Sequence, residues 1–247
     1  MRAALFVTCL TDTFFPRAGE AVVRVLRHFG CAVEFPPAQT CCGQPAYNSG
    51  FHRAARDVAA HWVEVFDPYE CVVTPSASCA AMISRHTPEL LADDPALKRA
   101  AERLAERTYE FSVFLRDRLL VDTAALLRIA EPFTVHYPCH ARGVYSVGEL
   151  CASLPGEGPN GLRLPRHTDL CCGFGGMFAI DQPQISGAMA GDKLDELAAT
   201  RAELVVCNEA GCTLNLMGSA NRRGMCLRFR HVAELLAESL GLLEPAP

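Results

Sequence analysis

The spacing of apolar residues at the start of the chain predicts a strand, a helix and a second strand in succession. The short run Arg2–Thr8 is largely apolar, as expected of a buried strand. Apolar residues then recur with a helical period over residues 18–29. Cys31–Phe35 is typical of a second strand, and two prolines end it. This order favours a parallel α/β unit.

The next segments continue the alternation of helices and strands. Residues Phe51–Phe66 predict a helix, for which Asn48 or Ser49 could provide the cap. Cys71–Thr74 predicts another buried strand, and Cys79–Arg85 a short helix that starts beyond it. The first half is therefore predicted to alternate strands and helices.

The second half repeats this order. Phe133–Tyr137 predicts a strand, Asp181–Thr200 a helix capped near Asp181, and Leu204–Val206 a further strand. A last strand at Arg228–His231 and a closing helix at Val232–Leu240 complete the pattern. The predicted fold class is α/β, with two similar Rossmann-like halves that each contain a short parallel sheet.

Eight of the thirteen cysteines form two sets of four with nearly the same spacing. In each set a single cysteine precedes a Cys-Cys-Gly triplet by 32 residues, and a last cysteine follows the doublet after 37 or 40 residues. Both sets lie where predicted strands end, and open α/β sheets bind ligands at the carboxyl ends of their strands. The two sets are Cys9, Cys41, Cys42, Cys79 and Cys139, Cys171, Cys172, Cys212.

The repeat divides the chain into three parts. We expect residues 1–88 and 132–247 to form the two cysteine-rich modules, each with a Cys-Cys-Gly triplet. Residues 89–131 contain no cysteine and are expected to be a mostly helical bridging segment, packed on one half.

Composition limits the classes of function. The net charge is −5, from 23 basic and 28 acidic side chains without a basic block, which argues against nucleic-acid binding. No run approaches the roughly 20 apolar residues of a membrane span. The apolar start of the chain lacks the small-residue cleavage site of a signal peptide, so we expect a cytoplasmic protein.

Iron–sulfur chemistry is the first hypothesis for the eight thiols. Thirteen cysteines are an odd number, and adjacent cysteines pair poorly in disulfides. Clusters need several soft thiolates in one pocket, and each doublet supplies two where Gly43 or Gly173 lets the backbone turn tightly. Zinc also accepts four thiolates, but its structural sites usually consist of paired short knuckles. The pattern therefore favours iron–sulfur over zinc.

The other cysteines have a simpler explanation. Free cysteines are often buried as small apolar residues, and this is expected of Cys31, Cys71, Cys151 and Cys226. Cys207 ends a predicted strand five residues before Cys212 and is a candidate extra ligand.

Three polar residues near the two sets are weaker candidates. His140 and Arg142, beside Cys139, could donate hydrogen bonds to cluster sulfurs or bind an anionic substrate, although isolated residues of these types are more often structural. Glu209 could offer an oxygen ligand or cap the helix that contains Cys212. Glycines 173, 175 and 176 lack the strand–GxGxxG–helix context of a nucleotide site.

Six segments, in order along nearly the whole chain, resemble the lactate utilisation protein A family, whose members contain duplicated CCG modules. They are FVTCLTD, QTCCGQPAYNSG, TPSASCAAM, PCHARG, CCGFGGMF and EAGCTLNLMG. The wider superfamily includes the heterodisulfide reductase B subunit and the glycolate oxidase iron–sulfur subunit. The resemblance implies one or two 4Fe-4S clusters held by the eight cysteines. It also implies a cytoplasmic electron-transfer subunit that oxidises L-lactate to pyruvate with two partners, another iron–sulfur protein and a third component.

The sequence departs from the full module of that superfamily at one position in each half. The module ends in CxxC and provides five cysteines for a non-cubane cluster, whereas Ser76 and Glu209 stand where the first cysteine of CxxC would be. Each half keeps four cysteines, so two options stay open for one half: that it holds zinc, or that it is empty. Two other functions stay open: a zinc-stabilised scaffold without redox activity, and a thiol or disulfide reductase that acts at its own cluster.

Overall fold

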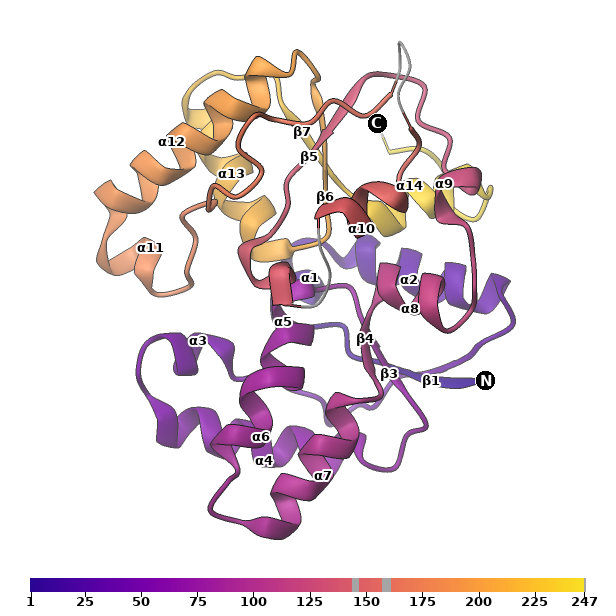
Figure 1. Ribbon diagram of the computed structural model, residues 1–247, viewed down its shortest axis with the longest axis vertical. Helices are drawn as coiled ribbons and strands as arrows, with labels where there is room; N and C mark the ends of the chain where they lie inside the picture. The colour runs from indigo at the N-terminus through magenta and orange to yellow at the C-terminus, as the bar shows by residue number, and fades with distance from the viewer. Residues whose placement is uncertain (144–146, 157–160, 247) are drawn as a thin grey trace.

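Two parallel sheets form the framework of the computed structural model, which describes residues 1–143, 147–156 and 161–246 (Figure 1). The first sheet has the strand order β2-β1-β3-β4 and the second the order β5-β6-β7. Every pairing between these strands is parallel. The strands are β1 (Arg2–Leu5), β2 (Ala32–Glu34), β3 (Val72–Thr74), β4 (Thr108–Glu110), β5 (Phe133–Val135), β6 (Leu204–Cys207) and β7 (Arg228–His231). The α/β fold with two similar halves is confirmed.

Helices connect the strands in both halves. In the first half they are α1 (Cys9–Phe14), α2 (Pro16–His28), α3 (Gln44–Asn48), α4 (His52–Phe66), α5 (Ala77–Ala81), the π-helical turn η1 (Met82–His86) and α6 (Thr87–Leu90). Next come α7 (Pro95–Ala105), α8 (Phe111–Asp117) and α9 (Thr123–Leu126). The second half contains the 3-10 turn η2 (Cys139–Gly143), α10 (Val147–Ala152), α11 (Phe178–Asp181), α12 (Pro183–Ala199), α13 (Ala210–Arg222) and α14 (Val232–Ser239).

One apolar core is shared by the two halves. It joins Leu5 of the first sheet and Val206 of the second through side chains such as Val22 of α2, Phe114 of α8 and Leu236 of α14. Each sheet also has a core of its own on its other face, against α4 and α7 in the first half and α12 and α13 in the second. Because a strand alternates its side chains between two faces, these short, fully buried strands serve both cores.

The segment between the two repeats contributes a strand that the sequence reading missed. β4 (Thr108–Glu110) pairs with β3 at the edge of the first sheet, where β7 pairs with β6 in the second. We expected residues 89–131 to be mostly helical, and the rest of the described structure there is helix and turn. Thr108–Glu110 (TYE) lacks the apolar run that marks the equally short strands β3 (VVT) and β5 (FTV), so its sequence does not indicate a buried strand.

Two helices, α4 and α12, begin at residues other than those expected. Asn48 ends the short helix α3, and Phe51, without a side-chain cap, precedes α4. Asp181 ends α11, and Gln182 precedes α12. In both places a helix of four or five residues comes before the predicted one, and such short elements give no periodic signal. Ser76 caps α5, because its Oγ accepts a hydrogen bond from the Cys79 amide at 3.2 Å.

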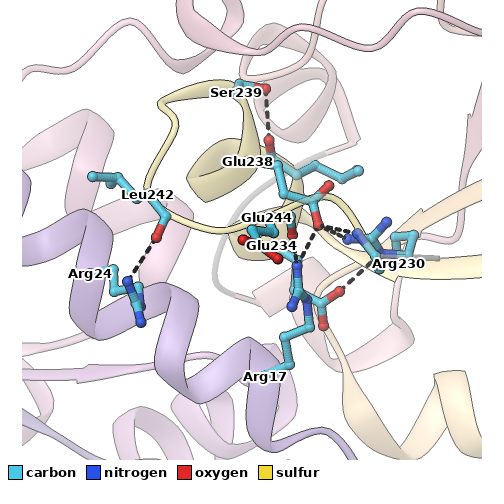
Figure 2. A network of polar contacts seen from close by, with 10 residues as sticks. Arg17, Arg24, Arg230, Glu234, Glu238, Ser239, Leu242 and Glu244 are labelled. Carbon is cyan, nitrogen blue, oxygen red and sulfur yellow. Dashed lines mark hydrogen bonds and ion pairs between the residues drawn. The ribbon is translucent and has the colours of Figure 1, made fainter.

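A charged network fastens α2 of the first half to α14 of the second (Figure 2). Glu238 of α14 accepts hydrogen bonds from Arg17 of α2 at 2.8 Å and from Arg230 of β7 at 2.5 Å. Arg230 also pairs with Glu234 at 2.9 Å, and Arg17 donates to the carbonyl of Glu244. Burial pushes the pKa of Glu238 upward, but the hydrogen bonds from Arg17 and Arg230 outweigh burial and hold the pKa below its usual value.

No helix in the described part of the chain is long and apolar enough to cross a membrane.

Replacing Glu238 by Gln should destabilise the fold at neutral pH, by about 1–3 kcal/mol, because two partly buried guanidinium groups lose their shared counter-charge. The matched control is Glu20→Gln, since Glu20 forms a half-exposed pair with Arg24 and should cost less than about 1 kcal/mol. A carboxyl group whose pKa is lowered in the native state stabilises the fold at pH values above its unfolded pKa, which is about 4.3 for Glu. This stabilisation is lost as the pH falls through the native pKa. In urea unfolding, the loss of unfolding free energy caused by Glu238→Gln should therefore be smaller below pH 4 than at pH 7. Equal losses for Glu238→Gln and Glu20→Gln at pH 7 would contradict this role of Glu238.

Candidate functional site: a cavity lined by two sets of thiols

All eight cysteines of the repeated sets line one cavity of about 200 Å³ between the two halves. Each set combines residues from the same places in its half: the end of the first strand, the Cys-Cys-Gly loop, and the helix after the next strand. These places are carboxyl ends of parallel strands, where the backbone leaves the sheet. The structure thus brings together the thiols that the repeat singled out, and it brings both sets to the same space.

The first set contains a short chain of thiol contacts. The Sγ atoms of Cys9 and Cys41 lie 3.9 Å apart, and the Cys41 Sγ also accepts a hydrogen bond from the Gly43 amide at 3.4 Å. Hydrogen bonds from the Cys42 and Cys9 thiols lower the pKa of Cys41 to about 3. The pKa of Cys42 is raised well above its ordinary value, because its thiol donates to Cys41 and is also buried. Cys41 is therefore the thiolate of this set.

The second set repeats this arrangement. The Gly173 amide donates to the Cys171 Sγ at 3.4 Å, and hydrogen bonds from Cys139 and Cys172 lower the pKa of Cys171 to about 2. The Sγ atoms of Cys172 and Cys212 lie 3.1 Å apart. In each set a thiolate accepts hydrogen bonds from neighbouring thiols. A metal that binds the set would displace the protons of those thiols.

The glycine after each doublet is a conformational requirement. Gly43 and Gly173 have φ of +87° and +80°, in the left-handed region that favours glycine. A Cβ on Gly173 would lie 2.5 Å from the carbonyl oxygen of Ser186, whereas one on Gly43 would lie 3.3 Å from that of Ala55. The tight turn lets the following amide hydrogen bond to the first thiol of the doublet.

Ser76 of the first half and Glu209 of the second bind each other across the halves. Glu209 Oε2 accepts hydrogen bonds from the Ser76 hydroxyl at 2.9 Å and from the Ser78 amide at 2.7 Å. Its other oxygen accepts from the Gly211 amide at 3.4 Å, which caps α13. Both carboxylate oxygens of Glu209 are thus engaged in contacts that hold α5 and α13 at the wall of the cavity.

The other candidates lie in different environments. His140 lines the cavity, and its Nδ1 lies 3.5 Å from the Cys139 Sγ. Arg142 is exposed, lies outside the cavity lining and donates to the carbonyl of Asp169. Cys207 is buried behind the cavity, where its thiol contacts the Glu209 carbonyl at 3.6 Å, and burial raises its pKa.

The remaining four cysteines lie away from the cavity lining. Cys31 and Cys71 are buried in the core shared by the two halves, as expected of small apolar residues. Cys151 is half-buried and Cys226 is exposed, so for Cys226 the expectation of burial is wrong. Cys226 lies in the short link before β7, between Met225 and Leu227, which are half-buried and pack against the core of the second half.

His136 is a candidate that the sequence reading missed. It follows β5 directly, is buried, and has a ring nitrogen within 4.8 Å of the Sγ atoms of both Cys172 and Cys212. Burial, followed by the nearby charge of Lys193, lowers the pKa of His136 to about 3, so the imidazole is neutral. Alignment of the two repeats identifies this position, because His136 precedes Cys139 by three residues, as Phe6 precedes Cys9.

Comparison with known proteins agrees with the duplicated architecture. The sequence model of the cysteine-rich CCG domain matches residues 3–84 and again residues 133–217. Proteins called lactate utilization protein A from Bacillus thuringiensis (strain Al Hakam) and Bacillus cereus (strain AH187) are each 41% identical over 240 residues, which cover 96% of this chain and 98% of the relative. The protein of that name from Shouchella clausii (strain KSM-K16) is 40% identical over 238 residues, with the same coverage.

Gly173→Ala should destabilise the protein more than Gly43→Ala. Both substitutions place an alanine in the left-handed region, which costs about 1–2 kcal/mol of stability. Only at Gly173 is a backbone oxygen too close for a Cβ, and this contact adds about 1–3 kcal/mol to the cost. Gly30→Ala, also at positive φ but with open space around it, isolates the backbone cost. Urea unfolding of the metal-free protein measures all three. A Gly173→Ala variant as stable as Gly30→Ala would refute the packing explanation.

Proposed function

The chain belongs to the lactate utilization protein A family, and from this membership we propose that it is the iron–sulfur electron-transfer subunit of a multi-protein complex that oxidises L-lactate to pyruvate. The observation that carries the proposal is the convergence of eight thiols on one cavity. The family name supports a role in lactate utilisation, and the CCG domains support binding of a metal or a cluster. Oxidation of lactate to pyruvate releases two electrons and two protons.

The eight cysteines are the proposed ligands of one or two 4Fe-4S clusters. A cluster supplies the acceptance and transfer of single electrons. The donor set fits this group, since four soft thiols from three segments of each half face the same space, with one thiol of each doublet already favoured as thiolate. The amides of Gly43 and Gly173 would keep donating to the Cys41 and Cys171 sulfurs, which stabilises negative charge there.

Partner proteins are a further part of the proposal. The sequence has no flavin or nicotinamide fingerprint, so a cofactor that takes the hydride or electron pair from lactate would lie on another subunit. The letter A in the relatives' name fits a system of several components. We propose two partners, another iron–sulfur protein and a third component, and a cytoplasmic location for the complex.

Protein prepared without air should contain iron and acid-labile sulfide and give an electron paramagnetic resonance signal on reduction. Cys42→Ser and Cys172→Ser each remove one buried thiol from one set, and each should lower the iron content by about half if both halves hold a cluster. Cys226→Ser is the control, because Cys226 is exposed and outside the cavity lining. Zinc without labile sulfide would overturn the iron–sulfur function and favour the scaffold.

His140→Ala should lower lactate oxidation by the assembled complex roughly 10–100-fold, the usual cost of removing a group that contacts a metal ligand. Arg142→Ala should have a smaller effect, because its guanidinium binds a backbone carbonyl outside the cavity lining. Rates normalised to iron content separate these effects from cluster loss. An Arg142→Ala defect as large as that of His140→Ala, at unchanged iron content, would contradict this assignment.

A further inference from the structure

The two halves carry different residues at one equivalent position of the repeat. With Cys9 aligned on Cys139, Phe6 corresponds to His136. Phe6 is fully buried and packs edge-on against Trp62 and Phe66, with ring centroids 5.7 and 5.4 Å away. An apolar ring therefore fills this place in the first half, and space-filling alone does not require an imidazole in the second.

The backbone holds His136 firmly on one face of the second sheet. Its amide donates to the Val206 carbonyl at 3.0 Å, which extends the pairing of β5 with β6 by one residue. Side chains alternate along the strand, so that Phe133 and Val135 face the shared core while His136 faces the core that contains Cys172 and Cys212. The direction of the ring is thus set by the sheet.

The imidazole of His136 is buried without a hydrogen-bond partner. The side chain is 1% exposed, and among the described residues neither Nδ1 nor Nε2 has a partner. Buried polar groups are nearly always hydrogen-bonded, and an exception needs an explanation, such as a missing ion. One ring nitrogen and the Sγ atoms of Cys172 and Cys212 all lie within 4.8 Å of one another, as atoms around a single metal ion would.

We propose that His136 is a nitrogen ligand of the metal centre in the second half, so that this centre has mixed sulfur and nitrogen coordination while the first has sulfur alone. The inference rests on the proposed metal binding by the second set of thiols, but not on the identity of the metal. Both an iron of a cluster and a zinc ion accept imidazole beside thiolates. Unlike a thiolate, a neutral imidazole adds no negative charge to the centre that it binds.

The full chain, prepared without air in a Cys41→Ser/Cys42→Ser background, tests this proposal on the second half alone. Histidine labelled with ¹⁵N should give a nitrogen coupling in pulsed paramagnetic resonance if iron is bound, or a nitrogen shell in X-ray absorption if zinc is bound. His136→Phe, which copies the first half, should abolish the nitrogen signal and lower the metal content several-fold. His28→Phe, an exposed histidine at the end of α2, should change neither.

Two further measurements separate ligation from a structural role. His136→Cys should retain the metal through a thiolate and lose the nitrogen signal. Metal-free His136→Phe should unfold at the same or a higher temperature than the metal-free background, because an unpartnered polar ring is replaced by an apolar one. Zinc with a nitrogen ligand would support this inference while overturning the iron–sulfur function. A nitrogen signal unchanged by His136→Phe, or a second half without any metal, would overturn the inference itself.

Discussion

The two parallel sheets meet at their carboxyl ends, and this junction positions both sets of cysteines. Glu209 of the second half is buried and accepts hydrogen bonds from Ser76 and Ser78 of the first, so a displacement of the halves would leave a buried carboxylate unpaired. The Ala77 amide and the Asn208 carbonyl meet beside this contact at 3.4 Å. The two cysteine sets therefore line one cavity because the strands that carry them end at the same junction.

Crowding of thiols follows from this junction. Several thiolates in one small space repel each other, and the protein without metal resolves this by sharing protons within each set. In each doublet the first thiol, Cys41 or Cys171, holds the negative charge, and the pKa of the second, Cys42 or Cys172, is raised. A metal centre would replace those protons, so binding should release protons and stabilise the fold at the same time. The cavity is thus built for a positively charged occupant.

Much of this arrangement follows from the sequence. The closing strand and helix, the strand before Cys139 and the convergence of each set were predictable, because buried strands and long amphipathic helices have clear periods and the cysteine spacing repeats. β4 was missed because Thr108–Glu110 has no apolar run, unlike the equally short β3 and β5. The Ser76–Glu209 contact could not be predicted, since it depends on how the halves pack. His136 stood out only when the halves were compared residue by residue.

We expect iron to be bound by both thiol sets that line the shared cavity. Diffraction from crystals of the protein prepared without air, collected on both sides of the iron absorption edge, tests it directly. Anomalous density should lie against both sets, within reach of Cys42 and Cys79 in one half and of Cys172 and Cys212 in the other. Density that lies away from these thiols, or iron absent from both sets, would contradict it.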